Sequence, residues 1–278
     1  MFDVLERKMI VPNLHQLTVL APDVAKVIEP GQFVIVRADG NGERLPLSVA
    51  DWDRASGALT VIFMEVGAST GRLAALMPGD RIPTVVGPLG RPTALDRFGT
   101  VACIGGCYGI GSLFPAIRAL HEKGNRVIAF MEARSGYLHY WQERLAPYCQ
   151  RLFLITRDGS AGIKGHAGRI ADVLREEAIV PQRIFVNGCT FLIYKASIEL
   201  ARFDVPVIVS LNPIMIDGTG MCGVCRVTVD GKTRFACVDG PDFDGRQVDW
   251  AELLKRRKQY VDEEAFLVHD SGCGRRHP

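Results

Sequence analysis

Three cysteines and one aspartate near the C-terminal end of the chain have the spacing of a metal-cluster loop. Cys222 and Cys225 are separated by two residues, and Cys237 follows twelve positions after Cys225. Asp217 stands five positions before Cys222, so a cysteine in its place would complete the C-x4-C-x2-C…C spacing of plant-type [2Fe–2S] loops. Glycines between these residues permit positive φ and close approach of the backbone to an inorganic core. The pattern predicts a [2Fe–2S] cluster with Asp217, Cys222, Cys225 and Cys237 as its ligands.

Asp217 in the first ligand position would give this cluster an unusual donor. Carboxylate oxygen is harder than thiolate sulfur, so its presence predicts a lower reduction potential. Two other interpretations stay open. Zinc accepts three thiolates and one further donor, for which His269 and Cys273 are available. Asp217 followed by Gly218 is also typical of an ordinary turn.

A second chemical signal is the glycine-rich run over residues 105–111. Gly105, Gly106 and Gly109 follow an apolar stretch and, together with Ile110, precede a predicted helix that ends near residue 123. Such a turn between strand and helix places backbone N–H groups around a pyrophosphate. The run is not the G-x-G-x-x-G fingerprint, and glycines also serve simply to pack a strand against a helix. The context favours a dinucleotide site.

The elements that would position these residues fall into three segments. Over residues 1–96, alternation and turn signals predict a small Greek-key β-barrel. Its expected strands are 14–20, 33–38, 46–52, 59–66 and 80–86, with a short helix over 72–77.

From residue 97 to 211, strands and helices alternate, which predicts a doubly wound parallel sheet. The expected strands are 100–104, 126–132, 151–156, 183–187 and 205–210, and the expected helices are 113–123, 138–146, 169–176 and 191–201. Residues 212–278 carry the cluster loop, a hairpin of strands 226–229 and 234–237 joined across Asp230 and Gly231, and a surface helix over 248–258.

Composition excludes several classes of protein. The 278 residues are 47% hydrophobic, enough for real cores, and 33 basic against 31 acidic residues leave no nucleic-acid footprint. Apolar runs are too short to span a bilayer, and the first residues lack the regions of a signal peptide. Three of the eight cysteines are clustered and the others scattered, which fits a reducing compartment. We expect a cytoplasmic protein that binds neither nucleic acid nor membrane.

The order of barrel, glycine-rich α/β domain and C-terminal cluster loop resembles the ferredoxin–NADP reductase superfamily. The resemblance spans nearly the whole chain and is greatest to the branch that contains the electron-transfer subunit of dihydroorotate dehydrogenase. Within that branch, the runs 211–225 and 235–245 are similar to the small subunits of electron-bifurcating ferredoxin:NADP⁺ transhydrogenases. The dihydroorotate relatives would be expected to carry cysteine where this chain has Asp217.

This resemblance implies an NAD(P)H-dependent flavin and iron–sulfur oxidoreductase subunit. It implies FAD, a [2Fe–2S] cluster and NAD(H) rather than NADP(H) as cofactors. The sequence itself shows no acid–base pair or nucleophile–base constellation, so no catalytic residue is assigned. The resemblance also implies a heterodimer with a larger subunit that carries FAD and [4Fe–4S] clusters. Electrons would be exchanged with ferredoxin through that larger subunit. The alternatives are an electron-transfer subunit of dihydroorotate dehydrogenase and, from a different class, a non-catalytic iron–sulfur or zinc adaptor.

The superfamily's flavin motifs can be placed on two stretches. The first, at the end of a barrel strand, would contact FAD through Arg44, Pro46, Leu47 and Ser48; the alternative is a polar strand end. The second, at a helix start, would contact it through Glu65, Gly67, Ser69 and Thr70; the alternative is a helix cap formed by Ser69 or Thr70.

Nucleotide contacts implied by the resemblance lie at three strand ends. Gly188 and Cys189 would face the nicotinamide, although Cys189 could instead be a buried thiol. Glu132 would accept from ribose hydroxyls or be solvated. Residues 156–160 depart from the family pattern because Arg157 replaces an acid beside Asp158, so Arg134 and Arg157 are placed to approach a 2′-phosphate or simply to face water. A second departure, at residues 165–168, leaves that contact in doubt.

Overall fold

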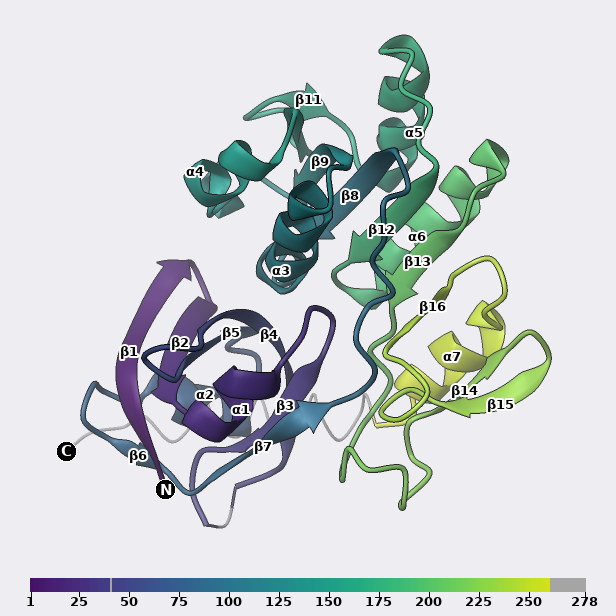
Figure 1. The fold of residues 1–278 in the computed structure, drawn as a ribbon. Helices are drawn as coiled ribbons and strands as arrows, with labels where there is room; N and C mark the ends of the chain where they lie inside the picture. The colour runs from purple at the N-terminus through teal and green to yellow at the C-terminus, as the bar shows by residue number, and fades with distance from the viewer. Residues whose placement is uncertain (41, 261–278) are drawn as a thin grey trace.

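The N-terminal part of the chain folds into a strongly curved, nearly closed antiparallel sheet (Figure 1). The computed structural model describes residues 1–40 and 42–260. Along β3, alternate side chains face opposite sides, as pleating requires: Val34 and Val36 fill the barrel, while Phe33 and Ile35 join the core beneath the other sheet. The barrel strands in sheet order are β6 (Arg81–Ile82), β1 (Phe2–Val11), β2 (Leu14–Leu20), β5 (Ala58–Met64), β4 (Leu45–Asp53), β3 (Phe33–Arg37) and β7 (Thr84–Leu89).

A second sheet forms the upper part of the molecule in Figure 1. Its strands are parallel except for the last, which runs antiparallel to its neighbour. In β8, Val101 and Cys103 face one side and Ala102 and Ile104 the other, so both faces are apolar and both are covered. The strand order is β11 (Ile163–Lys164), β10 (Arg151–Thr156), β9 (Arg126–Ala133), β8 (Thr100–Gly106), β12 (Arg183–Asn187), β13 (Val207–Ser210) and β16 (Asp242–Asp244).

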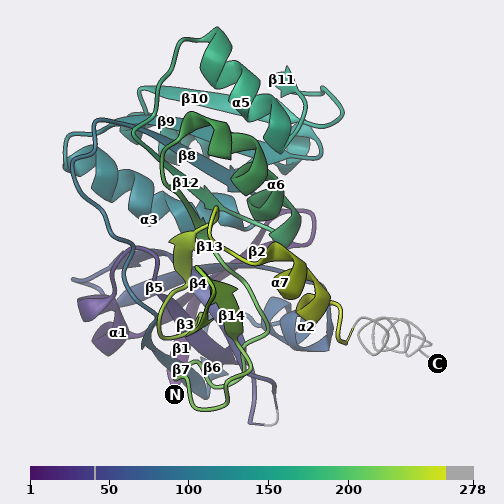
Figure 2. The ribbon, with the colours of Figure 1, turned by 90° about the vertical axis from the view of Figure 1, so that its right-hand side faces the viewer.

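Helices cover the two faces of this sheet, as Figure 2 shows. On the face toward the barrel lies α3 (Gly109–Glu122), with α4 (Gln142–Leu145) beside it. On the other face lie α5 (Ala167–Glu176) and α6 (Thr190–Leu200). The predicted doubly wound arrangement is confirmed. Short 3₁₀ turns complete the connections at Gly136–Leu138, Ala146–Tyr148 and Ala201–Phe203.

Residues 212–260 pack alongside both the barrel and the parallel sheet, on the right in Figure 1. Its hairpin consists of β14 (Arg226–Val229) and β15 (Lys232–Phe235). Asp230 and Gly231 both have positive φ, which is the turn that a two-residue loop between right-twisted strands requires. This turn sets the register, so β15 begins two residues before the expected strand. The final described helix, α7 (Trp250–Arg257), starts where Asp249 accepts a hydrogen bond from the Glu252 N–H at 2.9 Å.

Several elements differ from the sequence prediction. The sequence prediction missed the first strand β1, the helix α1 (Pro22–Val27), and the short strands β11 and β16. The helix expected at 72–77 is α2 (Ala68–Ala74). The helix expected at 138–146 is only a 3₁₀ turn and the short α4, because Trp141 between them has a φ of 58° and breaks the helical path. Among the described residues, no helix has the length and apolar character needed to cross a membrane.

Candidate cofactor-binding site

A large cavity of about 920 Å³ lies where the barrel, the parallel sheet and the C-terminal segment meet. Its walls come from β3, β4 and β5, the start of α3, the last residue of β12 and the loop after β13. A concave pocket of this size with a few convergent polar groups is the usual form of a cofactor site. The lining residues therefore indicate which predicted contacts the fold brings together.

The first predicted flavin motif lies in this cavity. Arg44, Pro46, Leu47 and Ser48 all line its wall at the start of β4. Arg44 is exposed and Ser48 is half-buried, so a guanidinium and a hydroxyl are both accessible to a bound molecule. Arg37 on the neighbouring strand β3 adds a second cation to the same wall.

The second predicted stretch reaches the cavity through Thr70, the one of its four predicted contacts that lines the wall, and through the neighbouring Val66. The Thr70 hydroxyl accepts hydrogen bonds from two backbone N–H groups just before α2, at 2.9 and 3.0 Å, and so caps this helix. Glu65 lies outside the lining and bonds to His15, with 2.9 Å between Glu65 Oε2 and His15 Nε2. Gly67 and Ser69 also lie outside it. Gly67, rather than Ser69 or Thr70, occupies the N-cap position of α2, and Thr70 caps the helix from its third residue.

The glycine-rich turn packs directly against the neighbouring β12–α6 turn. Gly105 and Gly106 end β8, and Gly109 opens α3. A Cβ atom on Gly109 would lie 2.1 Å from the carbonyl oxygen of Asn187, and one on Gly106 would lie 2.4 Å from Cδ2 of Leu192. Both separations are far inside van der Waals contact. Glycine is therefore required here for packing, whatever the turn binds.

Tyr140 holds the same turn from the protein interior. Its hydroxyl accepts from the Gly111 N–H at 2.9 Å and donates to the Cys107 carbonyl at 2.9 Å. Cys107 has a φ of 54°, a conformation that non-glycine residues rarely adopt. Burial raises the pKa of Tyr140, so the hydroxyl stays protonated. The predicted residue Ile110 is buried in the first turn of α3 and does not line the cavity.

A hydrogen-bond network that sequence reasoning missed joins four segments at the cavity. The Tyr108 hydroxyl donates to the Gly188 carbonyl at 3.0 Å and accepts from Asn212 Nδ2 at 2.7 Å. Asn212 Nδ2 also donates to the Gly188 carbonyl at 3.1 Å, and Asn212 Oδ1 accepts from the Thr190 hydroxyl at 2.8 Å. Arg257 of α7 donates to the Asn212 carbonyl. Burial raises the pKa of Tyr108 to about 12, so it remains a donor.

Glu132 and Arg157 form an ion pair at the ends of β9 and β10. Glu132 is 4% exposed, and its Oε1 lies 2.8 Å from Nε of Arg157. The interpretation of Glu132 as a solvated acid is therefore wrong, and Arg157 is paired rather than simply facing water. The Arg157 guanidinium also lies 5.8 Å from the centroid of the Phe191 ring. Cys189 is half-buried at the residue that precedes α6.

Asp158 is fixed by serine hydroxyls beside this pair. It accepts from the Ser135 hydroxyl and from the N–H and hydroxyl of Ser160, the last two at 2.9 and 2.6 Å. These bonds, that from Ser135 foremost, lower the pKa of Asp158 to about 2. The backbone N–H of Asp158 donates to the carbonyl of the exposed Arg134 at 3.2 Å. Both residues lie at the carboxyl ends of parallel strands, where doubly wound sheets bind nucleotides.

The four predicted cluster ligands lie on the loop after β13 and on the hairpin. Cys225 and Cys237 are buried, their Sγ atoms are 3.0 Å apart, and they form no disulfide. Cys222 is exposed. The Asp217 carboxylate accepts from the backbone N–H groups of Thr219 at 2.9 Å and Cys222 at 2.7 Å, and these bonds lower its pKa. The turn interpretation of Asp217 thus describes its present contacts.

Within residues 1–40 and 42–260, no three potential ligand side chains are gathered into a metal cage. The donor set still fits a thiophilic group, because the buried thiols of Cys225 and Cys237 lie side by side. Gly218, Gly220 and Gly223 have φ values of 75°, 87° and 65°, so the backbone between the ligands already takes the left-handed turns that a cluster loop needs. His269 and Cys273, the alternative zinc ligands, lie outside the described residues.

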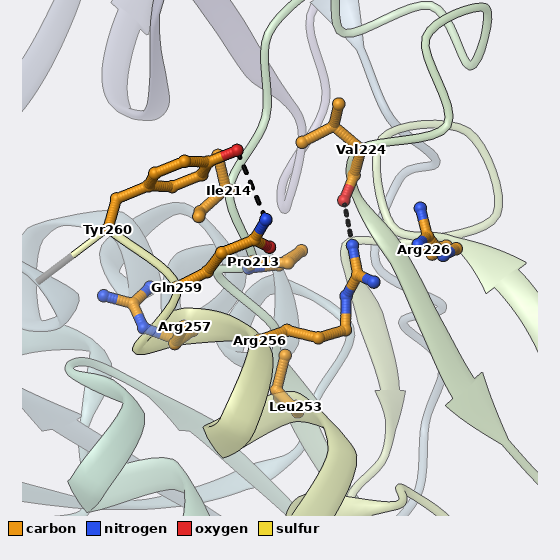
Figure 3. A pocket seen from close by; sticks show the side chains of 9 residues that line it. All are labelled: Pro213, Ile214, Val224, Arg226, Leu253, Arg256, Arg257, Gln259 and Tyr260. Carbon is orange, nitrogen blue, oxygen red and sulfur yellow. Dashed lines mark hydrogen bonds between the residues drawn. The ribbon is translucent and has the colours of Figure 1, made fainter.

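A smaller pocket of about 140 Å³ lies between the cluster loop, β14 and α7 (Figure 3). Among the residues that the structure describes, Arg226, Arg256 and Arg257 contribute to its wall and no acidic side chain does. Arg256 is anchored by donating to the Val224 carbonyl at 3.0 Å. Arg257 lines both this pocket and the large cavity, so α7 links the cluster segment to the cofactor site.

Solved structures with this architecture define its class. The cytochrome P450 reductase GcoB of Amycolatopsis superposes with a TM-score of 0.62 at 20% identity, over 73% of this chain and 65% of its own. A ferredoxin NADP⁺ reductase from Neisseria gonorrhoeae, solved with FAD and NADP, gives a TM-score of 0.58 at 17% identity, over 73% and 90%. These likenesses show the fold alone, which is that of ferredoxin–NADP reductases.

Nearer relatives share the whole chain. A structure of NADH-dependent reduced ferredoxin-NADP oxidoreductase, solved in a study of flavin-based electron bifurcation, has a TM-score of 0.91 and 39% identity over 97% of both chains. A dihydroorotate dehydrogenase B electron transfer subunit homolog of Thermotoga maritima is 41% identical over 94% of this chain and 92% of its own. Residues 212–249 match the iron–sulfur cluster binding domain of dihydroorotate dehydrogenase B. The chain belongs to the family of dihydroorotate dehydrogenase B electron-transfer subunits and their homologues.

Proposed function

We propose that this protein is the electron-transfer subunit of a flavin and iron–sulfur oxidoreductase, with FAD in the large cavity, NAD(H) at the ends of the parallel strands and a [2Fe–2S] cluster on the C-terminal loop. The observation that carries the proposal is that residues from three separate segments line the same cavity. The barrel motif with Arg44, the β8–α3 turn with Tyr108 and the loop after β13 with Asn212 all line one cavity. A carrier that exchanges hydride on one side and single electrons on the other needs that adjacency.

The chain's own residues supply binding and orientation. FAD, when bound, converts the two electrons of a hydride into single electrons. Arg44 is placed to hold its pyrophosphate by charge-assisted hydrogen bonds, and Ser48 to bond near the ring. The Tyr108–Asn212 network fixes the β12–α6 turn, on which Gly188 and Cys189 lie. Glu132, Arg134 and Asp158 are placed for the adenosine end of the nucleotide.

Single electrons are proposed to leave the flavin through the cluster on the C-terminal loop. Cys222, Cys225 and Cys237, with Asp217, are the proposed ligands; the first three would bind as thiolates. We assign the segments 1–96, 97–211 and 212–278 to flavin, nucleotide and cluster. We also assign the protein to the cytoplasm, in complex with a larger FAD and [4Fe–4S] subunit that communicates with ferredoxin. The names of the relatives, which include electron transfer subunits and a bifurcating oxidoreductase, support such a partner.

Two related activities are candidates within this family. The likeness to the bifurcating oxidoreductase over 97% of both chains, together with Asp217, favours the small subunit of a ferredoxin:NADP⁺ transhydrogenase. The second candidate is an electron-transfer subunit of dihydroorotate dehydrogenase. A non-catalytic adaptor has less support, because it would have no use for a cavity of about 920 Å³ lined by a flavin motif.

The flavin site can be tested by exchanging one arginine. Arg44→Ala removes a charge-assisted contact worth about 1.5–3 kcal/mol, so FAD affinity should fall about 10- to 100-fold. Arg81→Ala is the matched control, because Arg81 is an exposed barrel arginine that pairs with Asp3 and lies outside the cavity lining. Flavin content is measured after gel filtration. Full FAD retention in Arg44→Ala would place the flavin elsewhere.

Anaerobic purification from the native host tests the complete proposal. Iron, acid-labile sulfide and flavin should be present together, the larger subunit should co-purify, and NADH should bleach the flavin faster than NADPH does. Zinc without sulfide, or the absence of flavin, would contradict it. Faster bleaching by NADPH that is lost in Arg157→Asp would instead assign the cofactor as NADP(H).

A further inference from the structure

A half-buried carboxyl group, that of Asp242, lies beside the large cavity and has no role in the binding scheme above. Asp242 on β16 accepts a hydrogen bond from the Thr93 hydroxyl, with 2.6 Å between Thr93 Oγ1 and Asp242 Oδ2. Ser210, its cross-strand partner on β13, gives it a second hydrogen bond. Burial raises the pKa of Asp242, against the weaker lowering effect of these two hydroxyls.

A small cavity of about 20 Å³ lies against this carboxyl group and adjoins the large one. Asp242 and Thr93 line the small cavity, while Ser112, Asn187 and Ser210 line both cavities. Its volume suffices for one water molecule, and its polar walls offer the partners that such a water needs. A path of hydroxyl and amide groups therefore leads from the cofactor site to Asp242.

The charged groups near this carboxyl are already paired. On the same strand, Asp244 binds Arg246, with 2.6 Å between Asp244 Oδ2 and Arg246 Nη2. On the loops that flank the strand, Arg91 lies 3.7 Å from Asp239. The other elements around the small cavity contribute hydroxyl, amide, glycine and apolar residues to its lining. The raised pKa of Asp242 thus comes from desolvation of its carboxyl group rather than from a charged neighbour.

The proposed electron transfer also releases a proton, which needs an acceptor. A hydride carries two electrons and one proton, whereas a [2Fe–2S] cluster accepts electrons singly and takes no proton. Each hydride that enters and then leaves as two electrons therefore releases one proton in the cavity. This inference rests on the function proposed above. We propose that Asp242, reached through Ser210 and the small cavity, is the base that accepts this proton as the electrons leave, and returns it when the flow reverses.

The proton balance is complete within these groups. The Ser210 hydroxyl, or a water in the small cavity, receives the proton from the cofactor site and passes its own to the Asp242 carboxylate, which becomes a neutral carboxylic acid. A base must lie within hydrogen-bond reach, or one water away, of the proton it takes. The shared lining of the two cavities provides that reach.

The test separates the two half-reactions in the flavin-loaded protein. Stopped-flow measurements follow flavin reduction by NADH, and then its re-oxidation by a one-electron acceptor such as ferricenium. In Asp242→Asn, re-oxidation should slow by about 10²-fold, a typical loss for general base catalysis, and should lose the fall in rate that the wild type shows toward acid pH. Reduction by NADH should change little. If Asp242→Asn slowed both steps equally, the defect would be structural. That outcome, or re-oxidation of the variant at the wild-type rate, would overturn the proposal.

Infrared spectroscopy supplies a readout that does not depend on turnover. In infrared difference spectra taken as the pH is lowered to about 5, above the ordinary carboxyl pKa of about 4, the wild-type protein should gain the carbonyl band of a protonated carboxyl. This band should shift in D₂O and be missing from Asp242→Asn. Asp244→Asn is the matched control and should keep the band. Ser210→Ala should keep the band while slowing re-oxidation, because the acid remains but its link is cut. A wild type without the band would overturn the proposal, whereas failure of NADH to bleach bound flavin would instead overturn the proposed function.

Discussion

The glycine-rich turn and the cluster loop both use glycine beside a proposed cofactor, but for different physical reasons. In the turn, Gly106 and Gly109 are buried and touch neighbouring segments so closely that no Cβ atom fits. In the loop, Gly218, Gly220 and Gly223 have positive φ, and the chain between them is held by hydrogen bonds to one carboxylate, Asp217. The first site is fixed by packing. The second is fixed by backbone conformation and a single acid.

This difference predicts how each site responds to change. A packed turn transmits any added volume to the fold, so substitutions there should alter stability before they alter binding. A loop held by hydrogen bonds at the surface should tolerate substitution as a fold and lose only the group it binds. The first three predictions below test that division, and a fourth concerns the charge of one nucleotide-site carboxylate.

The largest effect is expected at Gly109. Gly109→Ala places Cβ 2.1 Å from a backbone oxygen that cannot move without shifting the β12–α6 turn, so we expect destabilisation by about 3 kcal/mol or more. Gly168→Ala is the matched control near the start of α5. Its nearest neighbour would lie at 3.7 Å, so it should be neutral or stabilising by about 0.5 kcal/mol. Denaturant unfolding of both variants decides; equal stabilities would show that the turn is not limited by packing.

Cys237→Ser should remove the cluster while leaving the fold. Serine is a poorer ligand for iron than thiolate, so iron and acid-labile sulfide should fall to background while flavin stays bound. Cys149→Ser provides the control, because Cys149 is a half-buried cysteine that packs near Tyr148, far along the chain from the cluster loop. Loss of flavin together with iron in Cys237→Ser would mean that the loop, too, is part of the packed framework.

Asp217→Cys asks whether the carboxylate is a ligand or only a turn residue. If it binds iron, exchange of oxygen for the softer thiolate should retain a [2Fe–2S] signal and raise its midpoint potential. Asp217→Asn keeps an acceptor for the Thr219 and Cys222 N–H groups but removes the charge. Redox titration of the two variants distinguishes the roles, and an unchanged potential in Asp217→Cys would leave Asp217 as a turn residue alone.

The smallest effect is a pH dependence at Asp158. Its pKa is lowered to about 2 in the folded state, below the ordinary value of about 3.9. The stabilisation is therefore present above about pH 4 and is lost as pH falls toward 2. Asp158→Asn should unfold earlier than wild type near neutral pH, with the difference vanishing in acid. A difference that persists at about pH 2 would mean that the serine hydrogen bonds do not depend on the charge.

Most of the framework was predictable because local patterns agree with the fold. Local sequence alone predicts the buried strands β8, β12 and β13, and it also predicts the turn at Asp230 and Gly231. Strand β1 was missed because its residues alternate only weakly, and β16 because it has just three residues, two of them acidic. The Tyr108–Asn212 bond joins residues 104 positions apart, and no local pattern encodes such a contact. Asp242 was overlooked for the same reason.

The cluster segment leaves and re-enters the parallel sheet at adjacent strands. Ser210 ends β13 and is paired with Asp242 in β16, and the Leu211 N–H donates to the Pro241 carbonyl at 2.9 Å. Residues 211–241 thus form a loop whose two ends are hydrogen-bonded to each other. The separation between cluster and cofactor cavity, on which the rate of electron tunnelling depends, is set at that junction rather than by a flexible linker. A chain cut after residue 211 would lose the cluster and also expose the edge of β13 to other chains.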